Sequence, residues 1–352
     1  MGSSPHGGVP DANRVRRNVS GVQAPAASLA QRLTAPPVPW STAIDRALYG
    51  ERGFYRTSGT PARHFRTSAH DNARWATVIA ALARRVEEAV GPGRFSVVDV
   101  GAGGGELLHE LAAMTPQHWQ LVGVDVAPRP EGLCDRVDWR SEPPKGFTGL
   151  LLANELLDVV PIDVAINTTH GPHRIDVHLT GEETLGPRLA GDALAWQQRW
   201  WPVHEPGDRI EIGRTRDALW RTLCACLDRG VAVAIDYAAH PELHRAGTLT
   251  GYRCGREVRP VPDGSCDLTA HVLFDSLATE GDLLITQHDA LAALGVAEPT
   301  TTYAGDPVEF ISGLKAAGDV ATLADPSGLG GFTWLLSGRE VLPPIGAASR
   351  NP

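Results

Sequence analysis

A glycine-rich segment at residues 97–108, VVDVGAGGGELL, has the residue types and spacing of a turn that holds a ligand. An apolar, β-branched run precedes the glycines and an apolar-periodic run follows them, which indicates a strand, a tight turn and a helix. Glycines suit such a turn because a backbone without Cβ atoms can come close to a ligand, and the N–H groups that open the helix point outward as donors. We predict a ligand-binding turn formed by Asp99, Gly101, Ala102, Gly103 and Gly105.

A second apolar run, LVGVD, ends at Asp125, twenty-four residues after Gly101. A carboxylate at this strand end could accept both hydroxyls of a ribose, so we place Asp125 and the following Val126 in the same site. A dinucleotide-binding turn has a third glycine where this chain has Glu106, and a carboxylate there would repel phosphates but is tolerable beside an ammonium group. The D-x-G-x-G-x-G pattern resembles motif I of class I S-adenosylmethionine-dependent methyltransferases, in which the turn holds an amino-acid moiety.

A third short strand is predicted over residues 137–139, where it ends in Asp138 and Trp139. An acid beside an aromatic ring at a strand's carboxyl end could hydrogen-bond an adenine amino group and stack on its ring. A surface acid and a core tryptophan would give the same pattern, and the sequence leaves both interpretations open.

A fourth strand is predicted within residues 148–164, TGLLLANELLDVVPIDV. Its apolar run ends in Asn154 and Glu155, with Asp158 just beyond, which places an amide and two carboxylates at the ligand-bearing edge of a sheet. Such a carboxylate pair could clamp a guanidinium group in bidentate fashion and accept its proton as a methyl group arrives, so we predict that Glu155 and Asp158 are catalytic. Alternatively, Asn154 caps a turn that contains the two acids.

Length, charge and cysteine content limit the class of protein. The chain of 352 residues, 42% of them hydrophobic, can fill a substantial core, and its net charge of −9 argues against duplex nucleic acid as the main partner. Five cysteines without a C-x-x-C pair suggest neither a disulfide framework nor a zinc site, and we predict no metal. No apolar run is long enough for a membrane span. A cytoplasmic setting fits best.

The segments outside these motifs predict one domain with insertions. Residues 1–38 lack periodicity and are expected to be a disordered leader, residues 39–338 the domain, and residues 339–352 a flexible tail. Two insertions are expected, at about 162–229, with a β-hairpin followed by helices, and at 238–268, an irregular lid loop. Further expected elements are helices near 40–50, 71–90 and 269–278, a loop over 50–70, and strands at 231–237, 282–287 and 332–337.

An ordered set of motifs resembles the MidA-type class I methyltransferases, relatives of a mitochondrial complex I assembly factor that methylates an arginine of a respiratory-chain subunit. The motifs are GFYR, HFRTS, DVGAGGGEL, ANELLDVVP, DY and DLTAHV, and the resemblance spans roughly residues 40–336. It implies an α/β fold with a Rossmann-like seven-stranded sheet and helices on both faces. The chain looks most like an actinobacterial branch of the family, and it departs from the family pattern at Ala238 and at residues 66–69, which weakens any transfer of substrate identity.

The resemblance implies a transferase that uses S-adenosyl-L-methionine to methylate an arginine of a protein or peptide. A small metabolite as acceptor, or a non-enzymatic assembly factor of the same fold, remains an alternative, although a pure scaffold has no reason to keep the open glycines. Whether the protein forms a homodimer is left open. Thr67 and Ser68 are carried over as cofactor residues. His271 is a candidate base or an ordinary core histidine. The candidate substrate residues are Phe54, Tyr55, Arg66, Asp236, Tyr237 and His271.

Overall fold

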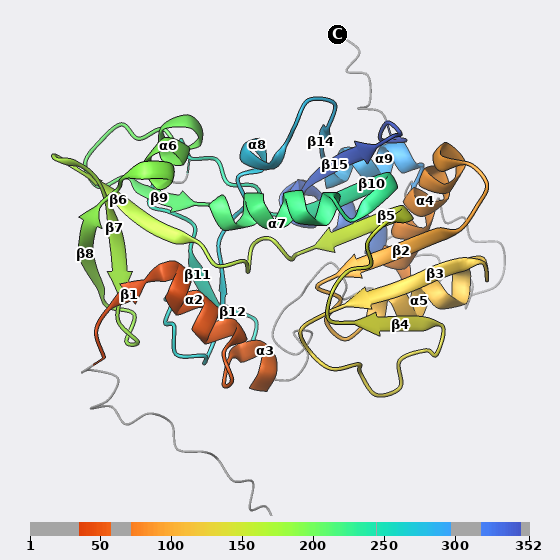
Figure 1. Ribbon diagram of the computed structural model, residues 1–352, viewed down its shortest axis with the longest axis horizontal. Coiled ribbons are helices and arrows are strands. Elements are labelled where there is room, and N and C mark those ends of the chain that lie inside the picture. Colours follow the sequence, from red (N-terminus) through yellow and green to blue (C-terminus); the bar gives the residue numbers. More distant parts are fainter. Residues whose placement is uncertain (1–34, 58–71, 244, 297–317, 346–352) are drawn as a thin grey trace, which may run out of the picture.

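The central element of the protein is a seven-stranded sheet (Figure 1). The computed structural model describes residues 35–57, 72–243, 245–296 and 318–345. The strand order is β14-β15-β10-β5-β2-β3-β4, in which β15 runs antiparallel to both of its neighbours and the strands from β10 to β4 pair in parallel. Its members are β2 (Phe95–Val100), β3 (Trp119–Val124), β4 (Val137–Arg140), β5 (Phe147–Asn154), β10 (Leu227–Asp236), β14 (Leu283–Thr286) and β15 (Thr333–Arg339).

This strand order places a switch point between β2 and β5. The chain continues from β2 toward β3 and β4 on one side, whereas β5 leads toward β10 on the other. In open parallel sheets the crevice outside the carboxyl ends of two such strands is the usual ligand site. The predicted sheet is confirmed, and the glycine-rich turn and the Asn154–Asp158 segment both lie at this switch point.

Helices cover both faces of the sheet, as predicted. Because side chains alternate along a strand, Val97 packs with α4, α5 and α9 on one face, while Val98 packs with α7 and α8 on the other. Figure 1 shows α7 extending across the molecule from β9 toward the central sheet. The helices are α4 (Asn72–Val90), α5 (Glu106–Met114), α7 (Arg214–Cys224), α8 (Phe274–Leu277) and α9 (Gln287–Leu294).

A second, antiparallel sheet is formed mostly by the first insertion. The predicted hairpin is present as β6 and β7, but two strands were not predicted, because β8 is mostly exposed and β9 is only four residues long within a segment expected to be helical. The elements are β1 (Val38–Pro39), β6 (Asp163–Thr168), β7 (Gly171–Val177), β8 (Glu183–Arg188), α6 (Gly191–Trp200) and β9 (Arg209–Ile212).

The second insertion is not the irregular loop that the sequence predicted. It forms a three-stranded sheet of β11 (Thr250–Arg253), β12 (Arg256–Val258) and β13 (Asp267–Thr269). These strands are too short to show an apolar period, and β11 pairs with β13 across a long loop, so local pattern gave no signal. The helix expected from residue 269 is correspondingly short, since β13 includes Thr269 and only α8 is helical.

Two short helices connect the two parts of the molecule. α2 (Trp40–Tyr49) and α3 (Phe54–Thr57) pack with residues of β6, β7 and β13 in one hydrophobic cluster. α2 ends before Gly50, as predicted. Near the first and last described residues, Val38 pairs with Val177 and Ile345 is buried in the main core.

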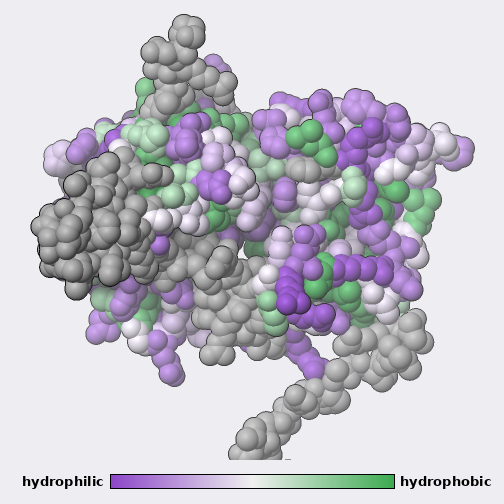
Figure 2. All heavy atoms as spheres, turned by 180° about the vertical axis from the view of Figure 1, so that it is seen from behind, coloured by the Kyte–Doolittle hydropathy of each residue, from purple (hydrophilic) through white to green (hydrophobic). Residues whose placement is uncertain are grey.

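The surface offers fewer functional clues than the interior. On the face seen in Figure 2, hydrophilic and apolar residues are interspersed over the described part of the surface, as on ordinary globular proteins. Among the described helices, none is long and apolar enough to cross a membrane. The switch point of the central sheet is therefore the expected position of a ligand site.

Candidate active site

A cavity of about 1190 Å³ lies at the carboxyl ends of β2 and β5. The central sheet supplies one wall, and α2, α3, β11 and β13 supply the facing wall. Most of the described residues predicted for the site line this cavity: Tyr55, Asp99, Gly101, Ala102, Gly103, Asp125, Val126, Asn154, Glu155, Asp158, Tyr237 and His271.

The glycine turn has the left-handed backbone that its sequence predicts. Gly101, Gly103 and Gly105 have φ angles of 78°, 57° and 74°. A Cβ at Gly101 would lie 2.9 Å from Leu156 Cδ1, whereas a Cβ at Gly103 would meet nothing within 4 Å. The positive φ favours glycine at both positions, and Gly103 in addition leaves open space beside the cavity. Gly105 is the N-cap of α5 and does not line the cavity.

Asp125 joins the end of β3 to the glycine turn. Its Oδ2 accepts a hydrogen bond of 2.9 Å from Gly103 N–H, and its Oδ1 accepts one of 2.8 Å from Ala127 N–H. Burial raises the pKa of Asp125 from its ordinary value, although these backbone hydrogen bonds act in the opposite direction. A carboxylate has about four lone-pair sites, so Asp125 retains acceptor capacity toward a ligand.

Asp99 lies at the end of β2, where it is 5% exposed. Burial, reinforced by the charges of Asp125 and Glu106, raises the pKa of Asp99 to about 7. Asp99, Glu106 and Asp125 therefore line one side of the cavity, where the charges of the other two disfavour the charged form of Asp99. This clustering favours a ligand that carries positive charge over one that carries phosphates.

Asp138 and Trp139 do not line the cavity, so the predicted adenine contacts are not brought together there. The Trp139 indole packs against the turn, within 3.2 Å of where a Cβ of Gly105 would be, and its Nε1–H donates to Ala127 O at 3.1 Å. Asp138 is exposed and forms an ion pair with Arg140. The alternative interpretation, a surface acid beside a structural tryptophan, agrees with these positions.

The Asn154–Asp158 segment follows β5 with an unusual backbone. Glu155 has φ of 48°, uncommon for a residue with a side chain, and its N–H donates to Ile235 O at 2.9 Å. Strained residues of this kind concentrate at functional sites. Asp158 is 9% exposed, and among the described residues no group hydrogen-bonds its buried Oδ1. Burial, together with the charges of Asp236 and Asp267, holds the pKa of Asp158 well above its usual range.

Asp236 is a buried structural neighbour of this segment and does not line the cavity, contrary to its prediction as a substrate residue. Its Oδ2 accepts hydrogen bonds of 3.0 Å from the N–H groups of both Leu157 and Asp158. Asp236 therefore caps this turn, a role that the sequence suggested for Asn154. Burial first, and the charge of Glu155 second, raise the pKa of Asp236 to about 7.

The facing wall contains an acid, Asp267, that was not among the predicted site residues. Asp267 lines the cavity and accepts hydrogen bonds of 2.9 and 2.8 Å from the Tyr55 hydroxyl. Burial raises its pKa to about 6, despite hydrogen bonds that lower it. The sequence did contain a signal for this residue, because Asp267 is the first residue of the DLTAHV motif. Phe54 is 2% exposed and lies outside the cavity lining, so the structure does not place it with the substrate residues.

Tyr237 and His271 form an aromatic part of the wall. Their ring centroids are 5.5 Å apart with an interplanar angle of 18°, and Tyr237 also lies 4.1 Å from the Phe332 ring. Arg66, Thr67 and Ser68 lie outside the described residues. Within the described part of the chain, no group of three or more His, Cys, Asp or Glu side chains could hold a metal ion.

The strand order, the glycine turn and the acid after β3 together define the class I methyltransferase fold. A family model described as "Putative S-adenosyl-L-methionine-dependent methyltransferase" matches residues 76–287. The chain belongs to this family, and the protein is an S-adenosylmethionine-dependent methyltransferase.

Two solved structures from Burkholderia thailandensis are similar to this chain. One, described as a "likely methyl transferase" bound to S-adenosyl-homocysteine, is 24% identical with a TM-score of 0.74 and covers 90% of this chain and 91% of its own. The other, a native structure from the same superfamily, is 23% identical with a TM-score of 0.71 and covers 89% of this chain and 91% of its own. At these identities the likeness establishes a shared fold. No curated protein matches the chain.

Proposed function

We propose that the protein is a MidA-type methyltransferase that methylates an arginine side chain in a protein or peptide. The glycine turn would hold the amino-acid end of S-adenosylmethionine, and Asp125 would accept the ribose hydroxyls. The open space at Gly103 and the remaining lone pairs of Asp125 fit this cofactor. Bound there, the cofactor supplies an activated methyl group to the acceptor side of the cavity.

One observation carries the proposal. Asp158 is buried in the cavity wall with an Oδ1 atom that lacks a hydrogen-bond partner among the described residues, and Glu155 lines the same wall. A buried acceptor without a partner is unfavourable, and a planar guanidinium can donate to two carboxylate oxygens at once. An arginine side chain would therefore supply the hydrogen bond that Asp158 Oδ1 lacks among the described residues.

The charge of the acceptor side agrees with a cationic acceptor. Asp45, Glu155, Asp158 and Asp267 line this side, and Arg56 is the one arginine in the described lining. The charges of Asp267 and Glu155 contribute to the raised pKa of Asp158, and an incoming cation would stabilise its charged form. An anionic acceptor would be repelled by this arrangement.

The raised pKa of Asp158 also suits the proton transfer. When a guanidinium nitrogen forms its bond to the methyl carbon, the bond from carbon to the sulfonium sulfur breaks, and the nitrogen must release a proton. A carboxylate whose pKa lies above its usual range is a better acceptor for that proton than an ordinary surface acid. We assign this step to the Glu155 and Asp158 pair.

Space beside the cavity supports an acceptor larger than a metabolite. A neighbouring depression of about 750 Å³ shares Thr250, Tyr252 and His271 with the cavity. A peptide that inserts one arginine into the cavity would have room for its adjoining residues in this depression.

Incubation with tritium-labelled methyl donor and a cell lysate tests the proposal. Label should appear in acid-precipitable protein and be recovered as methylarginine after hydrolysis, and Asp158→Asn should lose this transfer while still binding S-adenosylhomocysteine. Label confined to small molecules would overturn the protein acceptor. Label on a protein residue other than arginine would overturn the proposal that the acids of this cavity bind a guanidinium group.

A further inference from the structure

The main chain of His271 is held by two side chains, one from each of the two insertions. Its N–H donates a hydrogen bond of 2.8 Å to Thr248 Oγ1, and its carbonyl oxygen accepts one of 2.6 Å from Arg216 Nη1. His271 lines both the cavity and the neighbouring depression. These two hydrogen bonds hold the backbone from which the imidazole extends at the boundary between the cavity and the depression.

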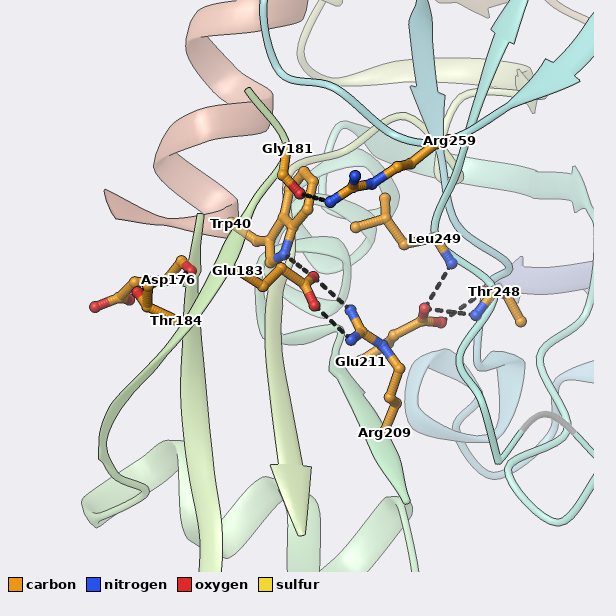
Figure 3. Close-up of polar contacts among 10 residues, drawn as sticks. All are labelled: Trp40, Asp176, Gly181, Glu183, Thr184, Arg209, Glu211, Thr248, Leu249 and Arg259. Atoms are coloured by element: carbon orange, nitrogen blue, oxygen red, sulfur yellow. Dashed lines mark hydrogen bonds and ion pairs between the residues drawn. The ribbon is translucent and has the colours of Figure 1, made fainter. Parts of the chain in front are cut away.

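Thr248 is in turn oriented by a buried carboxylate. Glu211, on β9 and 2% exposed, accepts the Thr248 hydroxyl at 2.6 Å and the N–H groups of Thr248 and Leu249 at 2.6 and 2.7 Å. Figure 3 shows the Glu211 side chain reaching across to this segment. Because a carboxylate can only accept, the hydroxyl hydrogen points to Glu211, which leaves the oxygen lone pairs for the N–H of His271.

Arg216, near the start of α7, makes the second connection. It is 3% exposed and donates to three carbonyl oxygens, those of His271, of Asp158 at 2.8 Å and of Ala270 at 2.9 Å. Burial lowers its pKa, and the charges of Asp236 and Glu211 oppose that shift. One guanidinium thus joins the acidic turn after β5 to the His271 segment, on two walls of the cavity.

We propose that Glu211 and Arg216 are positioning residues that set the His271 imidazole at the acceptor side of the cavity. The proposal rests on the proposed function only in taking this cavity as the place of methyl transfer. Buried charges are poor sources of stability, and apolar residues of similar volume would often serve a purely structural role as well or better. Here Arg216 instead donates to the carbonyl oxygen of His271, and Glu211 orients the Thr248 hydroxyl that accepts the His271 N–H.

The hydroxyl of Thr248 allows a test that leaves both charges in place. Thr248→Val removes the hydroxyl at nearly constant volume, and Thr248→Ser retains it. Thr184→Val is the matched control, because Thr184 lies on β8, where its hydroxyl makes a single 3.4 Å hydrogen bond to Asp176 O at an exposed position (Figure 3). Side-chain NMR of isotopically labelled histidine, with the His271 signal assigned through His271→Gln, reports the imidazole directly.

We expect Thr248→Val to move the His271 resonance and to lower methyl transfer to lysate protein about tenfold or more. Affinity for S-adenosylhomocysteine should stay within about twofold, since the contacts at the glycine turn are unchanged. Thr248→Ser and Thr184→Val should resemble the parent protein in every readout. An unchanged His271 signal in Thr248→Val would overturn the proposal.

A second variant covers the case in which Thr248→Val does not fold. Glu211→Gln keeps the volume but places an amide where the carboxylate accepted three hydrogen bonds, so it should produce the same movement of the His271 signal. The NMR readout needs no acceptor, so it separates this proposal from the proposed function. If the His271 signal moves while no arginine is methylated by the parent protein, the positioning role stands and the acceptor assignment falls.

Discussion

The carboxylate of Asp236, at the end of β10, accepts a 3.0 Å hydrogen bond from the backbone N–H of Asp158, beyond the end of β5. The two strands are parallel neighbours, and their carboxyl ends are thereby joined by a side chain as well as by the sheet. Since Glu155 lies in the same turn with a positive φ, Asp236 holds a strained segment in place. An acid that does not reach the cavity thus positions two that do.

Replacing Asp236 should destabilise the protein. Asp236→Ala removes the acceptor of two buried backbone N–H groups, of Leu157 and Asp158, and of the part-buried N–H of Tyr237. A loss of about 2–4 kcal/mol in the free energy of unfolding follows, because each buried unsatisfied group costs about 1–3 kcal/mol and the turn can partly relax. Urea unfolding at pH 8 measures it. Asp138→Ala, at an exposed position, should stay within about 0.5 kcal/mol of the parent, and equal effects of the two would contradict the assignment.

Asp99 should make the protein less stable as the pH rises. Its pKa is raised from 3.8 to about 7 in the folded state, so between these values the folded protein binds a proton that the unfolded chain has released. The contribution is therefore favourable at low pH and is lost as the pH rises through about 7, with an upper bound of about 4 kcal/mol.

Asp99→Asn removes this titration. The substitution should have little effect on the free energy of unfolding near pH 4 and should stabilise the protein relative to the parent above pH 7. Denaturant unfolding of both proteins across this range gives the difference. A difference that does not change with pH would show that Asp99 is not buried as an acid.

Asp125 should matter for cofactor affinity. In Asp125→Asn an amide would face one of the two backbone N–H groups that now donate to the carboxylate, and a ribose would lose a charged acceptor. We expect S-adenosylhomocysteine to bind about tenfold or more weakly by calorimetry, equivalent to about 1.4 kcal/mol. Asp138→Asn is the control and should bind normally. Tight binding of NADH by the parent protein would contradict the assignment of the turn.

Glu155→Gln and Asp158→Asn should separate binding from chemistry. Both residues lie on the acceptor side, so affinity for S-adenosylhomocysteine should stay near that of the parent. Methyl transfer should fall about 100-fold or more, because general bases contribute on the order of 10²–10⁴ to a rate. Transfer of labelled methyl to lysate protein measures the loss. Unchanged turnover in Glu155→Gln would remove that residue from the mechanism.

The central sheet and its ligand-bearing edge could be predicted because their signals are local. A buried parallel strand is a short apolar run, and its ligand-facing end is marked by glycine, aspartate or asparagine within a few residues, as at Gly101, Asp125 and Asn154. These positions line the cavity. The family resemblance depends on the same local motifs.

The other features of the fold and the site depend on contacts between segments that are distant in the sequence. β11 and β13 pair across an intervening loop, and Asp236 and Trp139 have packing roles set by neighbours far along the chain, so neither period nor residue type indicated them. Sequence alone determined the fold class and the position of a glycine turn at the ligand-bearing edge of the sheet. Only the tertiary structure decided which acids face the cavity, because whether a side chain is buried, paired or open to a ligand depends on the segments packed against it.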